Sequence, residues 1–106
     1  MNEFSLLTDD MAHCYQCARQ GKLRKALTVR AIFCDGTDND VIRSHQDGLV
    51  VPICWTCNLK LTMDERKQHA LHVEGQLAFE QAYPNRSFYK RYGKDYLLIK
   101  GRKAIT

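Results

Sequence analysis

The sequence predicts a small α+β domain whose two halves are tied together by cysteines. Two Cys-x-x-Cys pairs, Cys14 with Cys17 and Cys54 with Cys57, are separated by 36 residues. Two short runs rich in β-branched and apolar side chains lie between the pairs and indicate the strands of a hairpin. A helical pattern follows the second pair. The length of 106 residues is that of one domain, so we expect a single metal-stabilised unit over residues 1–106.

The first half of the chain can be assigned in order. Residues 1–12 are expected to form a loose lead-in, and residues 27–33 the first strand. Residues 34–40 are rich in Asp, Asn and Gly, a composition that predicts a turn or loop. Residues 49–53 form the second strand, in which Pro52 indicates a sheet edge or a strand end.

Helices are expected to fill most of the second half. One helix begins at or just after Cys54. Residues 62–65 match a capping box, with Thr62 as the cap, so either a new helix starts at Met63 or the first helix is interrupted there. Pro84 ends the helical region. The helix is expected to present one apolar face, made of Ala70, Val73 and Leu77, and to be weakened by Gly75 by about 1 kcal/mol relative to alanine.

The C-terminal part is expected to add a short helix from Phe88 to Tyr92, closed by Gly93, and a last strand over residues 96–99. Phe88 and Tyr92 are four residues apart and are expected to face the core together. Tyr89 is the better candidate for an exposed ring.

The four paired cysteines predict a structural zinc site. Each pair places two thiolates on one turn, and two pairs supply the four soft ligands of a closed tetrahedral site with no position for a catalytic water. Core thiols combined with a redox couple, or an iron–sulfur cluster, are the alternatives. The fifth cysteine, Cys34, is expected to be a buried small apolar residue or, less simply, a substitute ligand.

Composition favours a cytoplasmic protein. No run of about 18 apolar residues is present, so no membrane span is expected, and the N-terminus lacks the pattern of a secretory signal. In a reducing compartment, paired cysteines bind metal more often than they form disulfides.

Basic residues are concentrated in two blocks, while the rest of the chain is net acidic. Residues 18–33 hold five basic residues and no acid, and residues 86–103 hold seven against Asp95. Such segregation suits a basic face that binds nucleic acid, most simply DNA, although a solvated surface has the same composition. Aromatic residues within the second block could stack on bases or dock the C-terminal segment. The candidate nucleic-acid-binding residues are Arg19, Lys22, Arg24, Lys25, Arg30, Arg86, Tyr89, Lys90, Arg91 and Lys94.

Residues 53–60, Ile-Cys-Trp-Thr-Cys-Asn-Leu-Lys, resemble the L-C-x-x-C-N-x-x-K segment of HNH endonucleases that carry a four-cysteine zinc. The order of knuckle, hairpin, second knuckle and helix is similar to the treble-clef, or ββα-metal, fold of that family. Val50 to Cys54, together with a later H-x-x-G and A-F-E over residues 72–80, resembles small phage and prophage proteins of the same type. The resemblance covers residues 14–83 and implies a nucleic-acid partner, with a host or phage protein partner as another possibility.

The resemblance also implies a catalytic histidine at the end of the first strand and a divalent ion such as Mg²⁺ on the leaving phosphate oxygen. This chain has Val29 and Arg30 at that position. The tentative catalytic candidates are therefore His45, with Asp47 as a displaced metal ligand, and His72, which shares a helical face with His69. The alternative for each histidine is an ordinary loop or surface residue.

Three functions follow from these patterns. The first is a zinc-stabilised nucleic-acid-binding module on an HNH-like scaffold. The second is an active metal-dependent HNH endonuclease. The third is an adaptor or inhibitor whose zinc fold presents a protein-binding surface.

Overall fold

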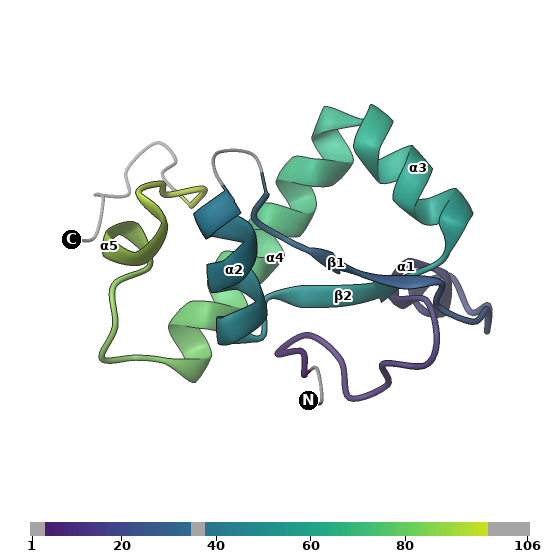
Figure 1. Ribbon diagram of the computed structural model, residues 1–106, viewed down its shortest axis with the longest axis horizontal. Coiled ribbons are helices and arrows are strands. Elements are labelled where there is room, and N and C mark those ends of the chain that lie inside the picture. The colour runs from purple at the N-terminus through teal and green to yellow at the C-terminus, as the bar shows by residue number, and fades with distance from the viewer. Residues whose placement is uncertain (1–3, 35–37, 98–106) are drawn as a thin grey trace.

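The computed structural model describes residues 4–34 and 38–97. Within these ranges it has a two-stranded antiparallel sheet and five helices, which confirms the α+β class (Figure 1). The elements in chain order are α1 (Tyr15–Arg19), β1 (Thr28–Ala31), α2 (Asp38–Asp47), β2 (Val50–Ile53), α3 (Trp55–Met63), α4 (Glu65–Ala82) and α5 (Phe88–Tyr92).

The two strands pair as expected, but a helix connects them. Thr28 lies opposite Ile53 and Ala31 lies opposite Val50. The predicted loop over residues 34–40 is wrong at its end, because α2 begins at Asp38 and continues to Asp47. Asp and Asn favour turns, but helices also prefer them at their N-termini. Composition over a few residues therefore cannot distinguish a turn from the start of a helix.

Hydrogen bonds to the backbone before α2 hold that helix against the sheet. The Ser44 hydroxyl, which is fully buried, accepts from the Phe33 backbone N–H and donates to the Phe33 carbonyl, each over 3.2 Å. Gly48 then ends the helix with φ of 77°, a conformation that favours glycine. These contacts bring the beginning of β2 directly beside the end of β1.

The N-terminal segment, expected to be loose, is hydrogen-bonded to the β2 region where it is described. The Ser5 hydroxyl donates to the Val50 carbonyl over 2.6 Å, and the Leu6 N–H donates to the Gly48 carbonyl over 2.8 Å. In Figure 1 this segment runs beside β2. β2 is consequently buried along its whole length.

The helical region breaks between α3 and α4, as the sequence predicted, but the cap differs. Asp64, with extended backbone, is the N-cap of α4, and its carboxylate accepts from the N–H groups of Arg66 and Lys67. Thr62 instead donates from its hydroxyl to the Asn58 carbonyl inside α3. The capping-box prediction therefore identified the interruption and misplaced its cap by two residues.

The predicted apolar face of α4 is wrong. Ala70 and Leu77 are exposed and Val73 is half-buried. The buried residues of this helix are Leu71, His72, Gly75, Gln76 and Phe79. The buried face contains a glycine, an amide and an imidazole, which a hydrophobic pattern does not select. Gly75 has a packing role, because a Cβ there would lie 2.9 Å from Ile32 Cγ2.

The C-terminal helix docks as predicted. Phe88 and Tyr92 are buried, and Tyr89 is exposed. Gly93 closes α5 with φ of 73°. The strand expected over residues 96–99 is not supported by its described part, because Tyr96 lies in a turn, and residues 98–99 lie outside the described ranges.

Cys34 is exposed, so the prediction of a buried small residue is wrong. It follows β1 by three residues, beyond the buried pair Ile32 and Phe33, where the chain has already left the core.

Candidate metal centre and the basic cleft beside it

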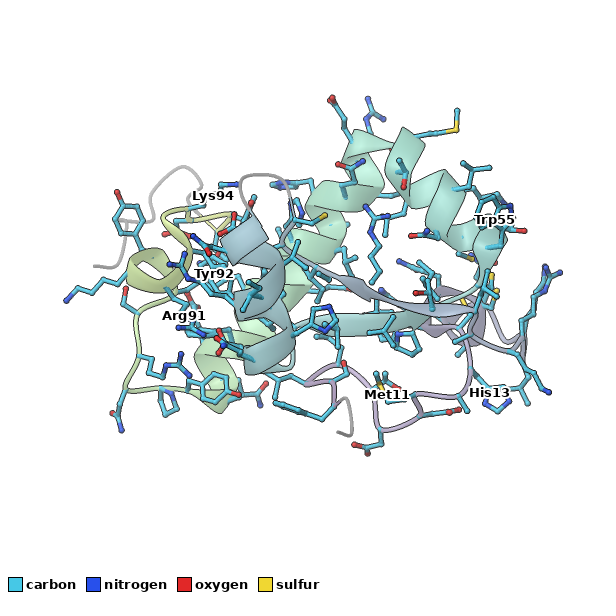
Figure 2. The ribbon with its side chains drawn as sticks, viewed as in Figure 1. Met11, His13, Trp55, Arg91, Tyr92 and Lys94 are labelled. Atoms are coloured by element: carbon cyan, nitrogen blue, oxygen red, sulfur yellow. The ribbon has the colours of Figure 1, made fainter. Side chains whose placement is uncertain are left out.

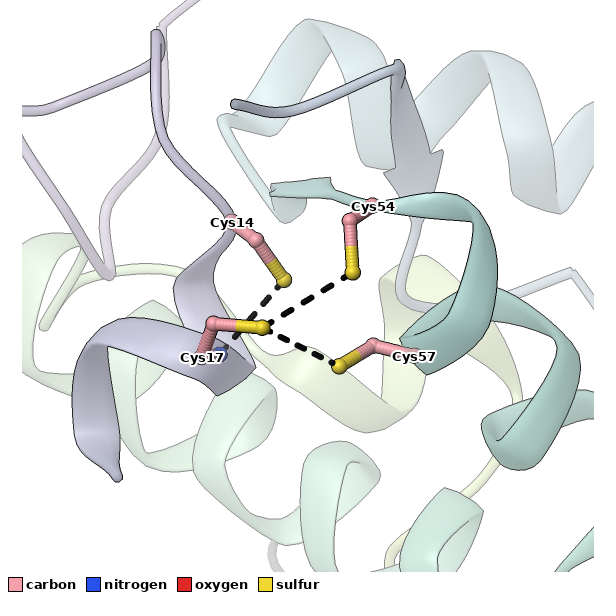
Figure 3. A group of neighbouring side chains, drawn as sticks. All are labelled: Cys14, Cys17, Cys54 and Cys57. Carbon is pink, nitrogen blue, oxygen red and sulfur yellow. Dashed lines mark hydrogen bonds between the residues drawn. The ribbon is translucent and has the colours of Figure 1, made fainter. Parts of the chain in front are cut away.

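Two helix starts bring the four paired cysteines together (Figure 3). Cys14 is the N-cap of α1, and its sulfur accepts from the Cys17 N–H over 3.5 Å. Cys54 directly follows β2 as the N-cap residue of α3, and Cys57 lies in the first turn of that helix. The strand pairing thus positions the second pair against the first across 36 intervening residues.

The sulfur geometry suits a tetrahedral metal ion. The Cys17 sulfur lies 3.7 Å from that of Cys54 and 3.6 Å from that of Cys57, and all four sulfurs lie within 4.8 Å of one another. A zinc ion with Zn–S bonds of about 2.3 Å requires sulfurs about 3.8 Å apart. A disulfide would require about 2.05 Å. The four cysteines could therefore hold a structural zinc ion.

The protonation of the cluster points the same way. Burial raises the pKa values of Cys17 and Cys57, whereas the backbone amide of Cys57 lowers the pKa of Cys54 to about 7. Of these three thiols, Cys54 therefore ionises most readily, whereas burial keeps Cys17 and Cys57 neutral. Ionising Cys17 and Cys57 in this buried place calls for a bound positive charge, which is the chemistry of a metal site.

The chain after α1 folds back around the cluster. The Cys14 N–H donates to the Arg24 carbonyl over 2.7 Å, and the Lys22 N–H donates to the Cys17 carbonyl over 2.9 Å. His13, which precedes the first cysteine, forms a backbone bridge with Lys25, and its ring pairs with Asp10 over 2.8 Å. The backbone that positions the cysteines therefore also positions the first basic block.

A cleft of about 310 Å³ opens beside the cysteine cluster, between α1, α3 and α4. Cys17 and Cys57 contribute to its lining, so the cleft adjoins the candidate metal site. Five of its lining side chains are cationic, namely Arg19, Lys22, Arg24, Lys60 and Lys67. Its lining includes one carboxylate, Glu74, which is paired with Arg19 over 2.9 Å.

Lys60 and Lys67 were not among the predicted nucleic-acid-binding residues. A signal existed for Lys60, since it follows Cys57 of the cysteine cluster by three residues on a helix and must lie near it. No comparable signal existed for Lys67, because its place depends on how α4 packs against α3.

The remaining residues of the first basic block lie elsewhere. The Arg30 guanidinium donates to Asn58 Oδ1 over 2.8 Å and to Thr62 Oγ1 over 2.9 Å, which ties β1 to α3. Lys25 is exposed on the strand-like segment that pairs with His13. The structure thus places three of these five predicted residues at the cleft.

The second basic block divides into structural and exposed residues. Arg86 and Arg91 both contact the buried carboxylate of Asp47, over 3.4 and 2.9 Å, and so hold the C-terminal segment against α2. Tyr89 and Lys90 are exposed on α5, and Lys94 is half-buried. None of the five lines the basic cleft.

The tentative catalytic residues lie in different surroundings. His72 is buried on α4. The centroid of its ring lies 5.4 Å from the ring centroid of Phe33 and 4.6 Å from that of Tyr96. His45 is half-buried near the end of α2. Over residues 4–34 and 38–97, the four cysteines are the one group of at least three metal-ligating side chains, so neither histidine belongs to a second such group there.

No family model, curated protein or solved structure matches this chain. None of the helices in the described part of the chain combines the length and apolar character needed to cross a lipid bilayer.

Proposed function

We propose that this protein is a nucleic-acid-binding module, built on a treble-clef scaffold of the HNH type and stabilised by a structural zinc ion at Cys14, Cys17, Cys54 and Cys57. The observation that carries the proposal is the basic cleft. Cations from the loop after α1, from α3 and from α4 converge on one concavity beside the cysteine cluster. Residues far apart in the sequence thus form one surface suited to a phosphate backbone.

The charge balance of the cleft supports an anionic ligand. Zinc with four thiolates carries two negative charges in excess, and Glu74 adds one more. The five cations exceed these three negative charges, so the cleft keeps a net positive charge even when the metal site is filled. The basic residues around the zinc site are therefore more numerous than its negative charge requires.

The contacts of Arg30 support binding without cleavage. The resemblance to HNH enzymes implies a catalytic histidine at the end of the first strand, where this chain has Val29 and Arg30. The Arg30 guanidinium donates to Asn58 and Thr62 of α3. A guanidinium remains protonated and cannot serve as a general base toward water.

The test is a salt-titrated binding assay with labelled DNA and RNA, on protein shown to contain zinc. We expect affinity to fall as salt rises, and the Lys22→Gln, Lys60→Gln and Lys67→Gln variants each to lower the salt slope by about one. Lys90→Gln is the matched control, since this exposed lysine on α5 does not line the cleft. Binding that is insensitive to salt, or weakened equally by Lys90→Gln, would contradict the proposal.

A further inference from the structure

Three large apolar side chains form an exposed row along α3, which we name the α3 ridge. Trp55, Leu59 and Met63 are 64%, 48% and 78% exposed. They follow one another at intervals of four residues, so they share one face of the helix over about 12 Å. Trp55 lies at the first turn of α3, at the outer edge of the molecule (Figure 2). Exposed apolar side chains that gather on one face can mark a binding surface, whereas singly scattered ones are ordinary.

The fold does not need the ridge. The core-facing residue of α3 is Leu61, at 2% exposed. Another side of the helix is tied to β1 through Asn58 and Thr62, which accept from Arg30. Other residues of the same helix therefore make its core and sheet contacts, and the ridge side chains remain largely exposed.

Positive charge flanks the ridge. Thr56 and Lys60, each one residue after a ridge residue, line the basic cleft. On the other side of the ridge, Arg30 lies against Asn58 and Thr62. A partner that covers the ridge therefore needs flat apolar groups and negative charge within a few ångströms of each other.

We propose that the α3 ridge stacks unpaired bases of single-stranded nucleic acid while the cations of the basic cleft hold its phosphates. This inference rests on the proposed function and names its substrate class. An unpaired base offers its face to an indole ring, whereas a duplex hides its base faces inside the stack. Leu59 and Met63 extend the apolar surface beyond Trp55, and Lys60 lies within reach of the backbone that links the bases.

A second copy of the chain suits the ridge less well. A two-fold antiparallel pairing centred on Leu59 would put each Trp55 against a Met63, which is favourable packing. The same symmetry would bring the two Lys60 side chains next to each other, at the edge of two cationic clefts. The phosphates of a nucleic acid are negatively charged and would instead complement the positive charge of the cleft.

Trp55 is the one tryptophan of the chain, so its fluorescence reports on the ridge directly. We expect a short single-stranded oligonucleotide to quench this emission, and a duplex of the same sequence at the same salt to quench it much less. Anisotropy of the labelled oligonucleotide measures affinity independently of the tryptophan. Trp55→Ala is expected to weaken single-strand binding about tenfold or more. Trp55→Phe, which keeps an aromatic ring, is expected to retain most of the affinity.

Leu77→Ala is the matched control, because Leu77 is an exposed apolar residue on α4 outside the ridge. Zinc content and circular dichroism establish that each variant is folded. Affinity unchanged in Trp55→Ala, with binding still weakened in Lys60→Gln, would overturn the stacking role and leave the proposed function standing. Loss of binding to every nucleic acid in the unmodified protein would overturn both. A ridge-dependent dimer in sedimentation experiments, without fluorescence quenching by oligonucleotide, would assign the ridge to a second copy.

Discussion

Arg91 on α5 donates from Nε to Oδ2 of Asp47, at the end of α2, over 2.9 Å. The Tyr92 hydroxyl donates to the same oxygen over 2.8 Å, and Arg86 reaches Oδ1 over 3.4 Å. Burial, with the nearby Asp47 carboxylate, raises the pKa of Tyr92, so its phenol stays a donor over the whole physiological range. Asp47 thus joins two helices that are more than 40 residues apart in the sequence.

Removing this carboxylate should destabilise the fold. Asp47 is 4% exposed at the side chain and lies at a helix C-terminus, where a negative charge is unfavourable unless compensated. We expect Asp47→Ala to lower the free energy of unfolding by about 2–4 kcal/mol, somewhat less than for a fully buried pair because Arg91 and Arg86 reach solvent. Urea denaturation measures the change. Gln46→Ala, which loses one exposed bond to Arg91, is the control and should cost well under 1 kcal/mol; equal effects would contradict the assignment.

Removing the metal should unfold most of the domain. Binding of structural zinc is worth on the order of 10–16 kcal/mol in small peptides, which is comparable to a typical domain stability of about 5–15 kcal/mol. We expect complete chelation to abolish the near-ultraviolet circular dichroism, and restored zinc to recover it. Metal analysis should give one zinc per chain. An unchanged spectrum after full chelation would show that the cysteine cluster is not needed for the fold.

Gly75→Ala tests the close approach of α4 to the end of β1. Alanine favours a helix by about 1 kcal/mol over glycine. At this position its Cβ would lie 2.9 Å from Ile32 Cγ2 and 3.1 Å from Phe33 Cζ, and both of those side chains are buried. Overpacking of this kind costs about 1–3 kcal/mol, so we expect net destabilisation in thermal or urea unfolding. Gln81→Ala, at an exposed position of the same helix, should be close to neutral, and a stabilised Gly75→Ala variant would refute the packing role.

The nuclease alternative makes a separate prediction. Asp47 is committed to Arg91 and Tyr92, and His72 is enclosed by aromatic rings, so neither is poised to hold a catalytic ion. We expect no plasmid nicking with magnesium, manganese or nickel by the purified protein. Nicking that is abolished by His45→Ala would contradict this expectation, whereas nicking that survives both His45→Ala and His72→Ala would identify a contaminant.

Local signals in the sequence were enough for several elements. The two Cys-x-x-Cys pairs predicted the four members of the cysteine cluster, because the spacing of two thiols on one turn is a short-range property. The β-branched runs predicted both strands, and the spacing of Phe88, Tyr89 and Tyr92 predicted which rings are buried. In each case the signal lies within a few residues of the chain, although the pairing of β1 with β2 was needed to bring the two cysteine pairs together.

Tertiary structure decided the rest. The composition of residues 34–40 was compatible with both a loop and a helix start. The contacts of Ser44 with Phe33 show how α2 is held. The buried face of α4 holds His72, Gly75 and Gln76 because partners from β1 and the C-terminal segment meet them there. Two further arrangements likewise depend on residues far apart in the chain. Arg86 and Arg91 bind Asp47, and Lys60 and Lys67 line the same cleft. The sequence by itself thus determined which residues could bind metal and form strands. Packing determined which charges remain available to a ligand, because a charged side chain pairs within the protein or faces solvent according to what the fold places beside it.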